Sequence, residues 1–176
     1  MRKVTRAALA LAGSAALIGV TTVPSFAAAD TTPVTVTITP GVLSITAPTG
    51  ASLSTGVPGA DSTVALTATE VTDERAGTVN WTATVALPAL TGTVLTTQTI
   101  PTTGATYLAG AATSTGTPTL AAPTSKTDLS TAAVTSQATT AVSGNNSASW
   151  TATLTVPIPA QVLADTYTGT MTQSVS

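Results

Sequence analysis

The chain of 176 residues contains no cysteine and no histidine. Without cysteine it can form no disulfide, no thiolate nucleophile and no cysteine-ligated metal site. Without histidine it lacks a Ser-His-Asp triad, a histidine general base and a histidine metal site. We therefore expect a protein that is not an enzyme, with no catalytic residues, no cofactor and no metal.

Charge is also scarce, at 7% of the residues. Beyond residue 29 the only positive side chains are Arg75 and Lys126, against seven acidic ones, which gives a formal charge of −5 for that part. Binding to phosphates or to anionic lipid surfaces requires clustered basic side chains. Nucleic acid and membrane surfaces are therefore poor partners for this chain.

The first thirty residues have the order of a secretory signal peptide. A basic start, Met1–Arg6, precedes a 14-residue apolar run from Ala7 to Val20, and small residues follow at 27–29. The run is shorter than the roughly 20 residues of a membrane-spanning helix, and a buried helix of the mature fold is the alternative. We expect cleavage after Ala29, with Ala27 as the second choice. The chain is then secreted and extracellular, with no membrane span after signal removal.

Removal of the signal peptide leaves residues 30–176, a length of 147 residues that suits one domain. Apolar side chains alternate with threonine along several short segments, and a period of two places the two kinds on opposite faces of a strand. Glycine, proline and asparagine separate these segments, as in a sandwich of short strands. The alternating segments are 34–38, 43–47, 64–68, 81–87, 150–156 and 167–175.

This pattern predicts an all-β fold, a single β-sandwich with Greek-key-like connections. We expect the C-terminal strand, 166–175, to lie inside a sheet. The stretch 110–128 is rich in glycine, threonine and proline, and predicts a long loop. The segment Leu129–Val142 is ambiguous, although its threonine content favours strand or irregular structure over helix.

One sequence pattern occurs twice. Trp81–Pro88 and Trp150–Pro157 both read Trp-Thr-Ala-Thr, followed by alternating aliphatic residues and proline. The echo reflects a duplication, two strands that face each other across the core, or chance convergence. Each tryptophan shares its strand face with aliphatic residues, and burial of such a ring contributes about 2–3 kcal/mol. A core position is therefore favoured over the alternative, stacking on a sugar ring.

The densest group of charged residues lies before a glycine turn. Glu70, Asp73, Glu74 and Arg75 precede Gly77, and such clusters are usually solvated. We expect a solvated strand end rather than the paired carboxylates of a glycosidase, because neighbouring strand residues point to opposite faces.

Two weaker alternatives remain for the charged side chains. Asp73 together with Asp128 or Asp165 could bind calcium, which takes only oxygen ligands, although no loop has the spaced acidic pattern of a calcium site. Lys126 could join an asparagine such as Asn145 or Asn146 in an isopeptide crosslink, but surface solubility is the commoner role of a lone lysine.

Two stretches resemble the WxL domain of Gram-positive surface proteins, as found in secreted proteins of high-GC Gram-positive bacteria. The first follows that family's order of aspartate, arginine, glycine and tryptophan, and the second its order of Val-Pro and a Tyr-Thr segment. The matching residues are Asp73, Arg75, Gly77 and Trp81 in the first stretch, and Val156, Pro157 and 165–172 in the second.

The chain departs from the family pattern at three positions. Alanine, Ala83, replaces the leucine of the first motif, and Gln173 stands where the second tryptophan is expected, with Val175 near the position of the second leucine. Only Trp81 carries over from the motif itself. The resemblance implies non-covalent attachment to the cell wall through peptidoglycan, and makes Trp81 the candidate wall-binding or core residue.

These observations favour a secreted, non-catalytic binding module of the cell surface or cell wall. Its expected partner is peptidoglycan or another surface protein. The alternative is a structural surface subunit that self-associates through sheet edges, because few charges guard the edges against pairing.

Overall fold

A computed structural model describes residues 29–130 and 133–176 of the chain. The expected signal peptide, apart from Ala29 at its cleavage site, lies outside the described residues. Contacts within the chain define one compact unit over Ile38–Ser176 and assign Met1–Thr37 to a separate unit. The strands of the described residues all belong to the unit that starts at Ile38.

The described residues form β-strands and no helix, so the all-β prediction is confirmed. The part of the chain that the structure describes accordingly contains no helix of the length and apolarity needed to cross a membrane. The strands are β1 (Leu43–Thr46), β2 (Asp61–Asp73), β3 (Thr82–Ala86), β4 (Leu90–Gly92), β5 (Thr99–Ile100), β6 (Thr106–Ala109), β7 (Thr113–Thr115), β8 (Thr119–Leu120), β9 (Ser125–Thr127), β10 (Val134–Ala141), β11 (Asn146–Pro157), β12 (Tyr167–Thr168) and β13 (Thr172–Val175).

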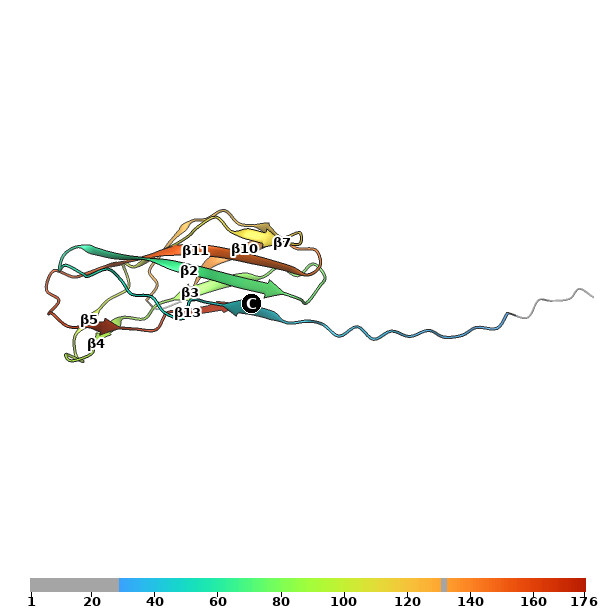
Figure 1. The fold of residues 1–176 in the computed structure, drawn as a ribbon, viewed down its shortest axis with the longest axis horizontal. Coiled ribbons are helices and arrows are strands. Elements are labelled where there is room, and N and C mark those ends of the chain that lie inside the picture. Colours follow the sequence, from blue (N-terminus) through green and yellow to red (C-terminus); the bar gives the residue numbers. More distant parts are fainter. Residues whose placement is uncertain (1–28, 131–132) are drawn as a thin grey trace, which may run out of the picture. The chain divides into compact units, whose positions relative to one another are not determined.

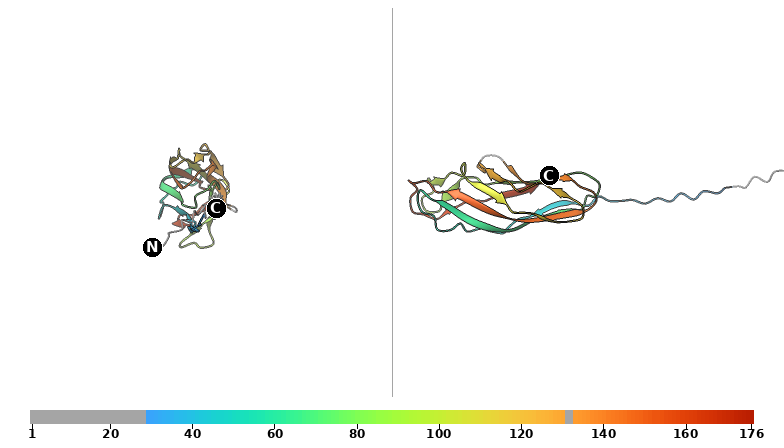
Figure 2. Two further views of the ribbon diagram at one scale, coloured as in Figure 1. Left: turned by 90° about the vertical axis from the view of Figure 1, so that its right-hand side faces the viewer. Right: turned by 90° about the horizontal axis from the view of Figure 1, so that it is seen from above.

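The strands form antiparallel sheets packed as a sandwich (Figures 1 and 2). The largest sheet has the order β1-β2-β11-β6-β9, with β7 also paired to β11. A second sheet has the order β13-β3-β10-β8, and a small third sheet the order β12-β4-β5. Neighbouring strands such as β2 and β11 are far apart in sequence, so the sheets are joined by long connections rather than by consecutive hairpins.

The apolar side chains of two of the predicted alternating segments, 81–87 and 150–156, form the centre of the core. The inward side chains of β11 alternate with exposed or half-buried threonines, and those around β3 do the same. All the members of both stripes are buried, as expected from their period of two. They are Trp81, Ala83, Val85 and Leu87 on one sheet, and Trp150, Ala152, Leu154 and Val156 on the other.

A β-bulge in β2 changes which of its residues face the core. Trp150 pairs with Thr69, whereas Ala152 pairs with Leu66, so that two residues of β2 oppose one residue of β11. The extra residue reverses the alternation, because each strand position points to the opposite face from the one before it. Ala68, which the stripe 64–68 places with Leu66, is therefore exposed, and Thr69 is buried instead.

The expected single C-terminal strand inside a sheet is wrong. The segment forms two short strands, β12 and β13, each at the edge of a different sheet. Gly169 lies between them, and a Cβ atom there would come within 2.6 Å of the Leu90 side chain. The chain changes sheets at this close approach, so it cannot continue as one strand.

The expected long loop over 110–128 is also wrong in part. It contains the short strands β7, β8 and β9, which pair with β11, β10 and β6 respectively. The segment Leu129–Val142 contains β10, which agrees with the strand that its threonine content favours. Pairing with neighbouring strands stabilises strands that their own composition only weakly specifies.

The stripe over Val34–Ile38 does not form a strand. Val34, Val36 and Ile38 have 91%, 82% and 84% of their surface exposed. Within residues 29–42 no residue is part of a sheet, and β1 starts only at Leu43. The pattern is that of a strand, but a strand needs a partner, and the described part of the chain provides none for this segment.

Candidate binding site

The two tryptophans of the repeated pattern meet in the core. Trp81 is 1% exposed and Trp150 is 2% exposed. Their ring centroids are 6.4 Å apart and their planes are 13° from parallel, a stacked arrangement. Of the two roles expected for Trp81, the structure places it in the core, where its ring has no face open to a ligand.

Each indole N–H has a buried partner, as buried tryptophans require. Trp81 Nε1 donates to Asn146 Oδ1 over 3.0 Å, and Trp150 Nε1 donates to the Tyr107 hydroxyl over 3.1 Å. Burial raises the pKa of Tyr107, so its hydroxyl stays protonated through the ordinary range. These bonds tie the tryptophans to β6 and to the start of β11.

The expected solvated strand end is wrong for Asp73, which is only 1% exposed. Its carboxylate accepts hydrogen bonds from Arg75 Nε, Nη2 and the Arg75 backbone N–H, at 2.9, 3.1 and 3.1 Å. The side-chain bond from Arg75 is the main cause that lowers the pKa of Asp73. Glu70 and Glu74, by contrast, are exposed as expected.

The alternative sites for a cation or a crosslink are not assembled. Asp73 is paired with Arg75, Asp128 accepts from Ser130, and Asp165 accepts from the backbone of the 94–95 turn. Among the described residues no three His, Cys, Asp or Glu side chains come together to hold a metal ion.

Lys126 lies far from Asn146. It pairs with Tyr107, and Tyr107 pairs with Leu154, eight residues along β11 from Asn146. Eight strand residues span about 26 Å, which exceeds the reach of a lysine side chain. The two side chains therefore cannot form the isopeptide bond in this fold.

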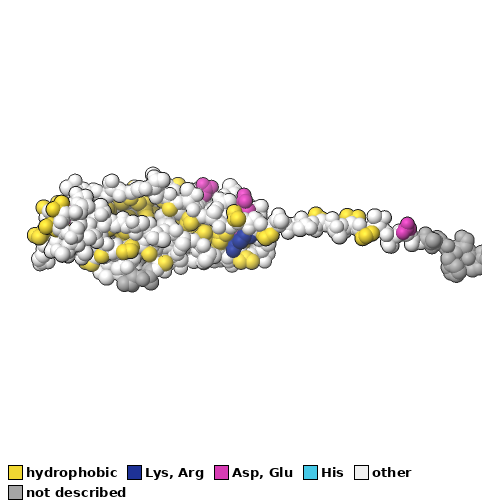
Figure 3. Space-filling view, turned by 90° about the horizontal axis from the view of Figure 1, so that it is seen from below, with side chains coloured by type: hydrophobic (Ala, Val, Ile, Leu, Met, Phe, Trp, Pro, Cys, Tyr) yellow, Lys and Arg dark blue, Asp and Glu magenta, His cyan; other side chains and the backbone are white. Residues whose placement is uncertain are grey.

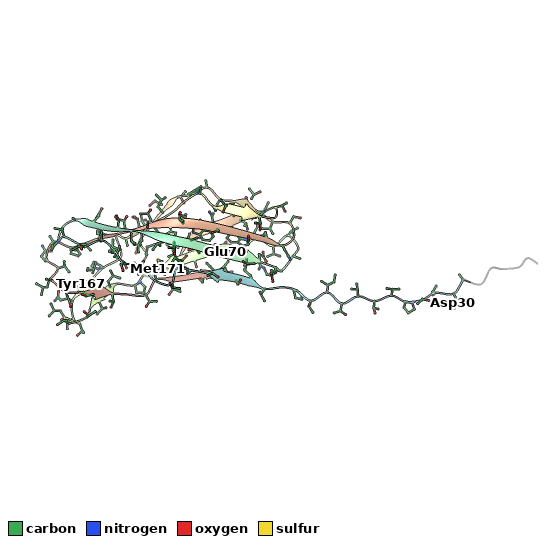
Figure 4. The ribbon with its side chains drawn as sticks, in the orientation of Figure 1. Asp30, Glu70, Tyr167 and Met171 are labelled. Carbon is green, nitrogen blue, oxygen red and sulfur yellow. The ribbon has the colours of Figure 1, made fainter. Side chains whose placement is uncertain are left out.

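A hollow lies between the sheets, lined by residues of β2, β4, β5 and β11 and by the segments 47–56 and 162–173. It has a volume of about 860 Å³, and one wall is the 47–56 segment that joins β1 to β2. A second wall is the segment from β12 to β13, along which Tyr167 and Met171 lie (Figure 4). The remaining walls are mostly apolar, and include Leu66, Leu87, Leu90, Ile100, Leu154 and Ile158.

Gln173 supplies an unusual polar group to this hollow. Its Oε1 accepts from Thr69 Oγ1 over 3.1 Å, but its Nε2 is buried and has no hydrogen-bond partner among the described residues. An orphaned buried donor costs roughly 1–3 kcal/mol. Gln173 stands where the WxL resemblance expects a second tryptophan, and the structure places it on the lining of the hollow.

Part of β2 beside the hollow lacks a neighbour on one side. β1 pairs only with Glu70–Asp73. Further along, Ser54 N donates to Thr63 O, and Thr63 N donates to Ser54 Oγ. Between these contacts no strand of the described chain pairs with residues 64–69 on that side. We call residues 64–69 of β2 the free edge.

The backbone groups of the free edge are available for pairing. Strand residues alternate in the side to which their N–H and C=O groups point, so Ala65 and Thr67 present theirs to the same side as Thr63. The 47–53 segment runs past this side without a backbone hydrogen bond to β2 among the described residues. The free edge is therefore covered loosely rather than paired.

The free edge has no charged side chain, and residues 31–60 have none either. On the face shown in Figure 3, the few charged side chains of the folded unit lie toward one end, and the rest of its surface is uncharged. Charge at a sheet edge is the usual protection against pairing with another strand. This edge lacks that protection.

The sequence indicated the uncharged edges but not the hollow. The hollow depends on β1 ending after four residues, and on the crossing of the chain between sheets at Gly169. Neither feature has a signal in the alternation pattern. The glycine could have indicated a close approach, but its partner Leu90 is nearly eighty residues away.

Comparison with known protein families and with curated proteins finds no match to this chain.

Proposed function

We propose that the chain is exported and acts as a non-catalytic structural subunit of the cell surface, which self-associates through its sheet edges. The observation that carries this proposal is the free edge of β2, an uncharged strand edge beside an apolar hollow. Such edges bind extended polypeptide by adding a strand, with main-chain hydrogen bonds for affinity and side-chain pockets for specificity.

The order of charge, apolar run and small residues before Asp30 supports export. The composition supports a role in binding, because it provides neither histidine nor cysteine for the common catalytic sites. Burial of both tryptophans argues against a tryptophan platform for sugar. A polypeptide strand fits the geometry of the free edge better than a carbohydrate chain does.

The test is the dependence of molecular mass on concentration for residues 30–176, measured by analytical ultracentrifugation. We expect the mass to rise with concentration, and Thr67→Lys to reduce the rise because it places a charge on the free edge. Thr153→Lys is the matched control, since Thr153 is an exposed threonine on the central strand β11. A chain that stays monomeric at every concentration contradicts the proposal.

Attachment to wall polymer is a second candidate, and Tyr167 is the observation that favours it. This half-buried aromatic residue lines the hollow and belongs to the stretch that resembles the WxL domain. Its hydroxyl donates to the Leu163 carbonyl over 2.9 Å, which leaves the ring to contact a sugar.

Sedimentation with purified peptidoglycan tests this second function. We expect Tyr167→Ala to reduce retention on the polymer, and Leu108→Ala, at an exposed residue on β6, to leave it unchanged. Trp81→Ala is unsuitable because Trp81 is a core residue. A wild-type chain that stays in the supernatant contradicts wall binding.

A further inference from the structure

The segment Pro33–Thr39 has the composition and pattern of a strand that belongs to a sheet. Val34, Val36 and Ile38 alternate with threonines, yet all three are more than 80% exposed. Burying these side chains against another apolar surface is favourable, because it removes their apolar area from water. Three such side chains in register form an apolar stripe without a partner in the described chain, which marks an interaction site.

The free edge of β2 offers the complementary surface. It has unpaired backbone groups at Ala65 and Thr67, and an apolar hollow beside it. A strand added there alternates its side chains between the hollow and the solvent. Its carbonyl oxygens are also the type of acceptor that Gln173 Nε2 lacks.

The lengths of donor and acceptor agree. The seven residues 33–39 extend over about 23 Å as a strand, and the six residues of the free edge, 64–69, extend over about 20 Å. An added strand follows the row of β1, which already pairs with Glu70–Asp73 of β2. The 47–53 segment has to move outward by about one strand spacing, 4.8 Å. This breaks no backbone hydrogen bond to β2, but it takes Leu53 off the core, and the incoming apolar side chains have to replace that contact.

The chain's own segment is attached at the wrong end of β2. β1 starts at Leu43 beside Asp73, remote from the free edge. The connection is held there, because Glu74 N donates to the Val42 carbonyl over 2.9 Å and Gly41 contacts Glu74. β1 itself occupies Glu70–Asp73, the part of the β2 edge that lies between this connection and the free edge. The donor strand must therefore come from a second molecule.

We infer that residues 33–39 of one copy add as a strand to the free edge of β2 in a second copy, with Val34, Val36 and Ile38 in the hollow. This inference rests on the proposed self-association and specifies its two surfaces. Donor and acceptor are different surfaces of the same chain, so the contact is heterologous and repeats from copy to copy. Cleavage after Ala29 would place the donor, which starts at Pro33, three residues from the new N-terminus at Asp30.

Engineered cysteines test the contact directly, because the chain has none of its own. Two variants of residues 30–176 are mixed, one with Thr37→Cys and one with Thr67→Cys, and only one carries a size tag. We expect a mixed disulfide dimer under mild oxidation, because opposed strand positions have Cβ atoms about 5 Å apart. Ser125→Cys, on the opposite edge strand β9, is the control acceptor and is expected to give little mixed dimer.

Point substitutions in the donor separate this inference from the proposed function. We expect Val36→Lys to abolish the concentration-dependent rise in mass, and Thr35→Lys, on the solvent side of the same segment, to retain it. A mass that rises equally for wild type and Val36→Lys overturns the inference but leaves self-association in place. Mixed dimers that form as readily with Ser125→Cys as with Thr67→Cys overturn the choice of acceptor. A wild-type chain that stays monomeric overturns both.

Discussion

Trp81 and Trp150 stack across the core, with ring centroids 6.4 Å apart and planes 13° from parallel. One belongs to the sheet of β3 and the other to the sheet of β11. This relationship accounts for the repeated Trp-Thr-Ala-Thr pattern as two strands that face each other. In a chain without disulfides, the pair forms the centre of the packing that holds the sheets together.

The stacked pair predicts a large loss of stability on truncation. Trp150→Ala should lower the free energy of unfolding by about 3–5 kcal/mol, because it leaves a cavity and removes the partner of the Tyr107 hydroxyl. Val94→Ala, at an exposed position, should change it by less than about 0.5 kcal/mol. Urea unfolding measures both. Equal stability of the two variants would contradict a large contribution of the stacked tryptophans to the free energy of unfolding.

The Asp73–Arg75 pair predicts an acid-sensitive contribution to stability. The pKa of Asp73 is lowered in the folded state, chiefly by the Arg75 side chain. The ionised carboxylate therefore stabilises the fold above the ordinary pKa of 3.8, and this contribution is lost as the pH falls through the lowered folded value. At neutral pH, Asp73→Asn should cost about 2 kcal/mol.

Urea unfolding as a function of pH measures this contribution. The difference between wild type and Asp73→Asn should shrink below pH 4 and vanish in stronger acid. Arg75→Ala should be at least as destabilising at neutral pH, because it removes the guanidinium and leaves the buried carboxylate without a counter-charge. A stability difference that stays constant from neutral pH into acid would show that the charge of Asp73 has no part in it.

Thr69 and Gln173 should be energetically coupled. Thr69 donates to Gln173 Oε1, while Gln173 Nε2 has no partner among the described residues. Thr69→Val alone should cost about 1 kcal/mol, and Gln173→Leu should reduce that cost because both polar groups are then removed. A double-mutant cycle by urea unfolding gives the coupling, expected to be about 1 kcal/mol. Strictly additive effects would mean that the hydrogen bond makes no net contribution.

The sequence predicted the parts of the fold that follow from local alternation. The stripes of β3 and β11 are in the core because a period of two has one structural meaning over a continuous strand. The prediction from the alternation was wrong at Ala68, where a bulge shifts the pattern by one residue. It was also wrong at 166–175, where the chain changes from one sheet to another. Both failures depend on partners distant in sequence, which a local pattern does not encode.

The candidate site was predicted only in outline. Low charge indicated unprotected edges, but which edge is free depends on the short length of β1. Asp73 was expected in solvent because its neighbours are charged, and it is buried because Arg75 folds back onto it two residues later. The exposed stripe at Val34–Ile38 gave a strand signal that no described part of the same chain satisfies.

Hydrogen exchange at the free edge tests most directly the claim that this chain assembles through β2. The Ala65 and Thr67 amides should exchange freely in dilute solution and become protected as concentration rises, while the amides of Val94 and Leu95, in a turn remote from that edge in sequence, stay unchanged. If the molecular mass rises while the Ala65 and Thr67 amides exchange as fast as before, the subunits meet elsewhere and the central claim is wrong.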